Sequence, residues 1–285
     1  MTNLKPETTN IILVTKASGE KEAFKIEKLE GSLRNAGAGN DIIDEIVADI
    51  MSWAYDGVTT KKIYTRAFSL LSRKKTVPAL RYKLKQAIME LGPTGYPFEH
   101  LVGIIFEKQG YQVSVGQIIE GHCVTHEIDV IATRADKQIL VECKYHQFQG
   151  KQVSVQVPLY VHSRIDDIIR KRKDMPEYQG FSFIGWVVTN TRLTSDSVQF
   201  GHCSGLKLMG WDFPAGNGLK DLIERERIYP LTILSKISKK EKQVLLNQGV
   251  VTCSQLWNNK EILASLELSK KKQDALLQEL NDICD

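Results

Sequence analysis

The chain of 285 residues lacks several features that would each assign it to a class of protein. It has no apolar run long enough to cross a bilayer, so we expect no membrane partner. Its start, MTNLKPETTN, has no basic stretch followed by an apolar one, which argues against a secretion signal. Its five cysteines include no CxxC pair, which argues against a disulfide framework or a zinc knuckle. Together these absences predict a cytoplasmic protein.

The chain also lacks a strong charge of either sign. Its net charge is +4, and residues 93–218 carry 12 Lys and Arg against 13 Asp and Glu. The middle of the chain therefore cannot hold nucleic acid through overall charge. Any such binding has to depend on local patches such as Arg170-Lys171-Arg172-Lys173.

The first segment, residues 10–92, combines strand and helix patterns. A strand (IILVTK) and a second short strand ending at Phe24 come before a series of helical patterns. Gly92-Pro93-Thr94-Gly95 then interrupts the chain, because glycine and proline do not continue a helix cheaply. The helices are expected at 26–36, 41–54, 59–73 and 77–90.

The second segment, residues 96–215, mixes helices and strands throughout. Its pattern predicts helices at 98–109 and 153–173, with a third that starts at Thr194. The expected strands cover 111–115, 124–132, 138–144, 183–189 and 206–211, with a turn around 136–137. This order predicts a mixed sheet with helices on its faces.

The third segment, residues 219–285, is expected to be helical and contains a repeat. Residues 237–248 align without gaps on residues 268–279. Ser238 and Glu241 form a capping box at the first copy. Ser269 is the corresponding cap of the second copy, but Lys272 stands where the capping glutamate would be. The three segments together predict an α/β multidomain protein.

The strongest chemical signal lies in ILVECKYH, residues 139–146. Because side chains alternate along a strand, Glu142 and Lys144 point to one face while Val141 and Cys143 can enter the core. Asp129 stands in the preceding predicted strand, with twelve residues between it and Glu142. A hairpin between these strands would bring the two carboxylates side by side.

Two converging carboxylates repel each other unless a cation lies between them. Oxygen ligands suit Mg²⁺ or Mn²⁺, and such an ion can activate a water and stabilise charge on a phosphate. Asp129 and Glu142 are therefore predicted metal ligands and catalytic residues. Lys144 would orient or deprotonate the water, or neutralise the phosphate. Glu99, near the start of the helix expected at 98–109, is the fourth predicted catalytic residue. The alternative interpretation is an ion-pair cluster without a metal.

This stretch resembles the Mrr-type branch of the PD-(D/E)xK nucleases. The matching residues are YPFEHLVGIIFEKQGYQV, HEIDVIA, ILVECK and WVVTNTRLTSDSVQFG, within residues 96–201. The resemblance implies a restriction-endonuclease-like fold over 96–215 and metal-dependent hydrolysis of phosphodiester bonds in double-stranded DNA. It also implies that Asp129 and Glu142 bind the metal, that Lys144 is catalytic and that Glu99 assists. Many such nucleases act in pairs, so a homodimer is possible.

The first segment is similar to an ATP-cone, a small nucleotide-sensing domain. The matching residues are VTKASGEKEAFKIEKLEGSLRNAG, GVTTKKIYTRAFSLL and PALRYKLKQAI, within residues 14–88. ATP or dATP would then be an allosteric ligand, and the absence of a GxxxxGK[ST] motif makes its hydrolysis unexpected. The candidate phosphate-binding residues are Lys16, Gly19, Lys28, Arg81 and Lys85. The alternative is a solvated basic helical domain.

Two stretches of the third segment, LLNQGVVTCSQLW (245–257) and LELSKKKQDALLQEL (266–280), resemble a pair of helix-hairpin-helix units. DNA contact and protein packing both stay open for it. The sequence as a whole predicts a Mg²⁺- or Mn²⁺-dependent DNA endonuclease controlled by a nucleotide effector. The alternative is a regulatory or DNA-binding protein that responds to nucleotide and keeps the nuclease fold without turnover.

Overall fold

A computed structural model describes residues 12–16, 19–74, 76–148 and 150–284, apart from the side chains of residues 76 and 77. The chain divides into two compact units, one up to Lys83 and the other from Leu84 onward. Within these described ranges, no helix is long and apolar enough to cross a membrane.

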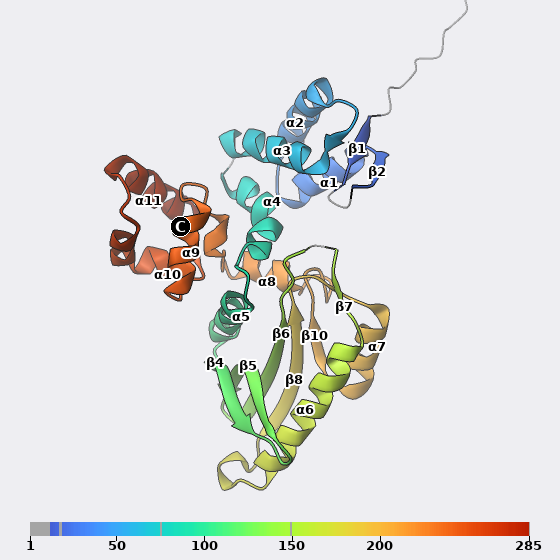
Figure 1. Ribbon diagram of the computed structural model, residues 1–285, viewed down its shortest axis with the longest axis vertical. Coiled ribbons are helices and arrows are strands. Elements are labelled where there is room, and N and C mark those ends of the chain that lie inside the picture. Colours follow the sequence, from blue (N-terminus) through green and yellow to red (C-terminus); the bar gives the residue numbers. More distant parts are fainter. Residues whose placement is uncertain (1–11, 17–18, 75, 149, 285) are drawn as a thin grey trace, which may run out of the picture. The chain divides into compact units, whose positions relative to one another are not determined.

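The first unit combines a small sheet with helices (Figure 1). Strand β1 (Leu13–Thr15) lies between β2 (Lys21–Ala23), which is antiparallel to it, and β3 (Val58–Thr59), which is parallel. The helices are α1 (Ile26–Asn35), α2 (Asn40–Trp53), α3 (Thr60–Lys74) and the first part of α4 (Thr76–Met89). Apolar side chains of α1, α2 and α3 share one core with β1 and β3. The four predicted helices are confirmed, whereas β3 was not predicted, because two residues directly before a helix give no separate pattern.

The second unit is built on a five-stranded mixed sheet in the order β10-β8-β6-β5-β4. The strands are β4 (Gln112–Glu120), β5 (Thr125–Arg134), β6 (Lys137–Lys144), β8 (Ser182–Thr189) and β10 (Lys207–Met209). Neighbours among β4, β5 and β6 are antiparallel, whereas β6, β8 and β10 are parallel. The predicted central mixed sheet is therefore confirmed. A short parallel pair, β7 (Gln152–Val153) and β9 (Arg192–Leu193), forms a separate ladder.

Helices cover both faces of this sheet, as Figure 1 shows. α6 (Gln156–Lys173) and α7 (Ser195–Ser204) lie on one side, where Val161 and Ile165 of α6 share a core with Leu140 and Val187 of the sheet. α5 (Tyr96–Lys108) lies on the other side, and its Phe106 ring packs edge-on against Trp186. Because Trp186 and Val187 are adjacent in β8, their side chains point to opposite faces.

Two elements differ from the predictions. β4 runs to Glu120, although the pattern predicted its end at residue 115. Gly116 has φ of +63°, which breaks the alternation without ending the strand, and pairing resumes at Gln117 opposite Ile128. The helix expected from residue 153 begins at Gln156, because residues 152–153 pair as β7.

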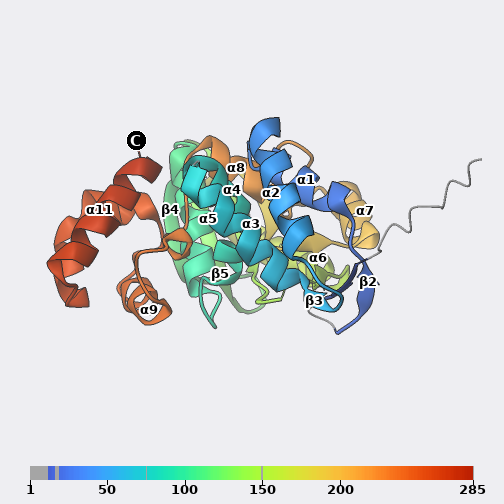
Figure 2. The same cartoon turned by 90° about the horizontal axis from the view of Figure 1, so that it is seen from above.

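The last part of the chain is helical, as predicted. It contains α8 (Leu219–Arg225), α9 (Lys239–Asn247), α10 (Cys253–Asn258) and α11 (Lys270–Cys284). Short 3-10 helices lie at Leu231–Ile233 and Lys260–Leu266, and a third, Pro176–Tyr178, comes earlier, between α6 and β8. Figure 2 shows α9 and α11 from above.

The two copies of the repeat contact each other at equivalent positions. Ser238 and Glu241 form the predicted capping box at the start of α9. Lys272 donates to both carboxylate oxygens of Glu241, at 2.7 Å each. Lys272 is the counterpart of Glu241 in the second copy, so an opposite charge at that position joins the copies. In the second copy, the position of the capping glutamate thus holds the ion-pair partner of Glu241.

Candidate active site

The candidate site lies where two neighbouring strands of the sheet part. β5 and β6 pair as far as Val130 opposite Val141, and beyond that point β5 pairs with β4 and β6 pairs with β8. Asp129 and Glu142 are the next residues on the two sides of the split. The backbone N–H of Cys143 donates to Asp129 Oδ2 at 2.6 Å, in place of a bond between backbones. The hairpin thus brings the two predicted metal ligands together.

The alternation of β6 determines which face the site occupies. Leu140 belongs to the core that contains Val161 and Ile165 of α6. Glu142 lies two residues further along the same face and contacts two other side chains of α6. Glu142 therefore shares a face of the sheet with Leu140. That face is buried rather than open, because α6 covers it.

Glu142 is 5% exposed and is held on both carboxylate oxygens. Lys144 Nζ and Tyr160 Oη lie 2.6 and 2.8 Å from Oε1, and Arg164 Nη1 lies 2.6 Å from Oε2. An ionised carboxylate offers about four acceptor positions. In the part of the chain that is described, these three donors leave one position on Oε2 for a further ligand.

Asp129 is a half-buried carboxylate close to the buried carboxylate of Glu142. Burial and then the charge of Glu142 raise its pKa to about 6. The hydrogen bond from Cys143 and the nearby cations Lys144 and Arg164 counteract part of this rise. A cation between the two carboxylates would favour the charged form of both.

Glu99 lies in the first turn of α5, near the same split. Burial raises its pKa to about 7, and the charges of Asp129, Glu127 and Glu142 add to the effect. The structure thus places the fourth predicted catalytic residue within electrostatic range of the carboxylate pair. A carboxyl group with this pKa exchanges its proton near neutral pH.

Lys144 remains a cation in this setting. Burial would lower its pKa, but the hydrogen bonds with Glu142 and Tyr160 outweigh that effect, and the net pKa lies well above its usual value. Its Nζ also lies 5.5 Å from the centre of the Tyr160 ring. Lys144 can therefore present a positive charge to an anion at the site.

The donor set fits a divalent ion with few protein ligands. Within the described ranges, no group of three or more His, Cys, Asp or Glu side chains forms a metal site by itself. Mg²⁺ needs only one or two carboxylates, because it keeps several waters and shares substrate phosphates. The open position on Glu142 and the raised pKa of Asp129 are consistent with such an ion.

The chain that follows Lys144 is held by a buried polar network. Thr189 Oγ1 donates to the Lys144 carbonyl at 2.7 Å. The Asn190 side chain accepts from the His146 N–H at 2.8 Å and donates to its carbonyl at 2.7 Å. Thr189 and Asn190 are fully buried. This network fixes the end of β6 and so the position of Lys144.

Sequence reasoning missed the side chains of α6 that contact the site. Tyr160 and Arg164 bind Glu142, and Asp167 accepts from the Cys123 N–H and from His126. Spacings of four and three residues place Tyr160, Arg164 and Asp167 on one face of a helix. That polar stripe was the signal available in the sequence.

The predicted basic patch at 170–173 is smaller than expected. Arg172 is 5% exposed, and its guanidinium lies 4.7 Å from the centre of the Tyr178 ring. Arg172 is therefore part of the core. Arg170, Lys171 and Lys173 remain at the surface, and Lys171 lies 3.7 Å from Glu120.

The candidate nucleotide-binding residues have different neighbours. Lys16 and Lys28 lie 3.0 and 3.6 Å from Glu22, next to the turn at Gly19, which has φ of +84°. Arg81 does not join them. Arg81 lies beside Gly37, beyond the end of α1 opposite to Lys28. Lys85 belongs to the second unit, where its Nζ lies 5.0 Å from the centre of the Trp211 ring.

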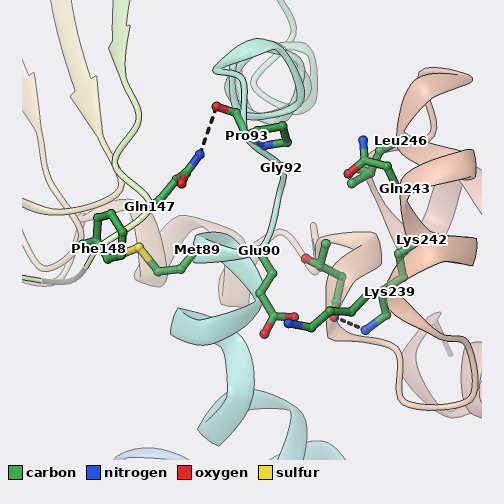
Figure 3. Close-up of a pocket in the computed structure, with 11 residues that line it drawn as sticks. Met89, Glu90, Gly92, Pro93, Gln147, Phe148, Lys239, Lys242, Gln243 and Leu246 are labelled. Atoms are coloured by element: carbon green, nitrogen blue, oxygen red, sulfur yellow. Dashed lines mark hydrogen bonds between the residues drawn. The ribbon is translucent and has the colours of Figure 1, made fainter. Parts of the chain in front are cut away.

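A pocket of about 350 Å³ lies between the α4–α5 connection, the loop after β6 and α9 (Figure 3). None of the four predicted catalytic residues lines it. Across one side of it Gln147 Nε2 donates to the Pro93 carbonyl at 3.0 Å, and beneath it Lys242 donates to the Thr232 carbonyl at 2.7 Å. The pocket is therefore separate from the carboxylate site.

The backbone N–H groups of the hairpin between α9 and α10 donate hydrogen bonds within the hairpin itself. Gly249 and Val250 donate to carbonyls of α9, and Val251 and Thr252 both donate to Gln255 Oε1. These four groups already have protein acceptors, which favours packing over phosphate binding at this hairpin.

Comparison with known proteins identifies two regions. A family model for restriction endonucleases matches residues 92–212, and a model for AF1548-like C-terminal domains matches residues 229–284. The first match confirms the predicted restriction-endonuclease-like domain. The resemblances of the first segment to an ATP-cone and of the last to helix-hairpin-helix units stay predictions.

One relative and one solved structure are each 30% identical to this chain. An uncharacterized protein of Archaeoglobus fulgidus is 30% identical over 180 residues, which are 63% of this chain and 97% of that protein. The crystal structure of the protein of unknown function AF1548 is 30% identical with a TM-score of 0.55, and the match covers 67% of this chain and 98% of that one.

Two restriction endonucleases are more distant. The DNA modification-dependent enzyme AspBHI is 11% identical with a TM-score of 0.34, over 59% of this chain and 39% of that one. MspJI, in complex with a 27-mer oligonucleotide, is 12% identical with a TM-score of 0.35, over 65% of this chain and 40% of that one. Scores this low do not establish a shared fold for the whole chains.

Proposed function

The chain belongs to the AF1548-like family and contains a restriction endonuclease domain at residues 92–212, and from this we propose that it is a metal-dependent DNA endonuclease. The observation that supports the proposal most is the split between β5 and β6. Asp129 and Glu142 stand on either side of it, with Lys144 and Glu99 in electrostatic range. This arrangement combines an acidic pair with the cation Lys144 and with Glu99, a carboxyl group whose pKa is raised to about 7.

In this proposal Asp129 and Glu142 hold a Mg²⁺ or Mn²⁺ ion, which when bound would activate water and neutralise charge on the phosphate. Lys144 keeps its proton and stabilises the added negative charge of the transition state. Glu99, with a pKa of about 7, takes up or releases a proton close to the reacting groups.

We propose double-stranded DNA as the substrate. The restriction-endonuclease-like domain has nearly balanced charge, so its hold on DNA depends on local cations. Arg170, Lys171 and Lys173, at the end of α6, are surface cations on a helix that also contacts Glu142. Cleavage of both strands would be helped by a homodimer, which analytical ultracentrifugation can detect.

Control by ATP or dATP is a separate part of the proposal. Its support is that Lys16 and Lys28 meet at Glu22, next to the turn at Gly19. A phosphate could replace Glu22 as the partner of both cations. The test is binding of a fluorescent ATP analogue, which the double substitution Lys16→Ala, Lys28→Ala should weaken. Equal binding by that variant and the wild type would refute this part.

The main test is cleavage of a panel of supercoiled and linear DNAs with Mg²⁺ or Mn²⁺. Glu142→Gln should reduce the rate by a factor of about 100 or more, because the metal site loses a charge. Glu177→Gln is the matched control, since Glu177 is an exposed glutamate in the 3-10 turn after α6. If no DNA is cut, or if Glu142→Gln cuts like the wild type, the endonuclease proposal fails.

The alternative is a regulatory protein that keeps the fold without turnover. It predicts no cleavage under any metal condition, and it does not need divalent ions at Asp129 and Glu142. A metal titration in which the melting temperature of the protein is measured therefore separates the two functions even before a DNA substrate is known.

A further inference from the structure

The stripe of α6 that faces the split has contacts on both strands. Tyr160, Arg164 and Asp167 lie along it at spacings of four and three residues. Tyr160 and Arg164 contact Glu142 of β6. Asp167 contacts the turn between β4 and β5 and the start of β5, through Cys123 and His126. One helix face is thus attached to both sides of the opening.

Arg164 is the residue of this stripe that bridges the split with a single nitrogen. Its Nη1 lies 2.6 Å from Glu142 Oε2 and 3.1 Å from the backbone carbonyl of Glu127. Glu127 stands two residues before Asp129 in β5, where no backbone bond to β6 remains. Arg164 therefore connects the two strands at the place where their ladder has ended.

Neutralising Glu142 does not by itself account for this geometry. Lys144 already supplies a cation at 2.6 Å from the same carboxylate. The bond from Arg164 to the Glu127 carbonyl adds nothing to the charge balance of Glu142. That bond does fix the separation of the two strands, and so the separation of Asp129 from Glu142.

The helix that carries Arg164 is itself anchored. Asp167 accepts from the Cys123 N–H at 2.9 Å and lies 2.8 Å from His126 Nε2. The pKa of Asp167 is held well below its usual value, chiefly by His126. Gly121 permits this close approach, because a Cβ at that position would collide with the Asp167 carboxylate. Arg164 therefore reaches the split from a fixed position.

We propose that Arg164 is a positioning residue that holds β5 and β6 at the separation at which Asp129 and Glu142 share one divalent ion. This inference rests on the proposed function. Arg164 need not contact the ion, since the open acceptor position of Glu142 remains beside it.

The test measures Mn²⁺ affinity by electron paramagnetic resonance, without DNA. Residues that orient metal ligands typically change metal affinity by about 10–100-fold when they are replaced. Arg164→Gln is expected to weaken Mn²⁺ binding within that range. Arg170→Gln, which removes the same charge from an exposed position of the same helix, should bind Mn²⁺ like the wild type. Arg164→Lys keeps a cation that can donate to both oxygens, so it should recover part of the loss.

Melting temperatures of the variants show whether each remains folded. If Arg164→Gln does not fold, Arg164→Lys is compared with Arg170→Gln instead. The inference is supported if Arg164→Lys binds Mn²⁺ more weakly than the wild type and Arg170→Gln does not. Unchanged Mn²⁺ affinity in a folded Arg164→Gln, or an equal loss in Arg170→Gln, would overturn the positioning role and leave the endonuclease proposal intact. Mn²⁺ binding by the wild type should be lost in Asp129→Asn. If the wild type binds no Mn²⁺, or if Asp129→Asn binds it equally well, the metal site and the role of Arg164 both fail.

Discussion

Asp129 is expected to destabilise the protein at neutral pH, so Asp129→Asn should stabilise it. Burial and the charge of Glu142 raise the pKa of Asp129 from 3.8 to about 6. At 1.36 kcal/mol for each pKa unit this difference corresponds to about 3 kcal/mol. Solvent screening at this half-buried site reduces the effect, so we expect Asp129→Asn to gain about 2–3 kcal/mol in free energy of unfolding above pH 6.5.

The pH dependence gives the sign of the effect. Between about pH 4 and 6 the folded protein binds a proton at Asp129 that the unfolded chain has released. The wild type therefore loses stability as the pH rises through this window, and an asparagine does not. The gain of Asp129→Asn should be full at pH 7.5 and should disappear near pH 4.

Guanidinium unfolding followed by tryptophan fluorescence measures this difference at several pH values. Asp136→Asn is the matched control, because Asp136 is exposed in the turn at the other end of the same hairpin, and it should change stability little. A stability gain that is equal at pH 4 and pH 7.5, or no gain at pH 7.5, would refute the reasoning. Saturating Mg²⁺ should reduce the difference in free energy of unfolding between Asp129→Asn and the wild type, because it should stabilise only the wild type.

Two further predictions concern packing and the repeat. Gly185→Ala should lower the free energy of unfolding by about 1–3 kcal/mol, because the added Cβ would collide with Ile165 of α6. Gly150→Ala is the control and should leave the free energy of unfolding unchanged, because the space around Gly150 is open. Glu241→Lys should cost about 1 kcal/mol in thermal or chemical unfolding, and adding Lys272→Glu should restore part of it. A swap that is no better than the single change would show that the ion pair does not join the copies.

The acidic pair could be predicted from the sequence because the signal is local. Alternation along β6 gave the face of Glu142, and the turn between β5 and β6 placed Asp129 beside it. The point at which the strands part could not be predicted in this way. It depends on the pairing of β5 with β4 and of β6 with β8 beyond the split. Sequence patterns along a single strand do not show those pairings.

Side chains that act across elements were also beyond the sequence patterns. Arg164 looks like any surface cation of a helix until α6 lies on the sheet. Lys85 and Arg81 are one turn apart on α4, which suggested a shared anion site, but tertiary contacts give them separate neighbours. Arg172 seemed part of a basic patch, and its burial follows from the aromatic side chains that surround it.

The central claim is that the split between β5 and β6 is a divalent metal site. Anomalous scattering from crystals soaked in Mn²⁺ tests it most directly. We predict a peak within about 2.5 Å of oxygens of both Asp129 and Glu142, the usual range for divalent ions with oxygen ligands. The absence of a peak between these carboxylates, in crystals where Mn²⁺ is bound elsewhere, would contradict the claim.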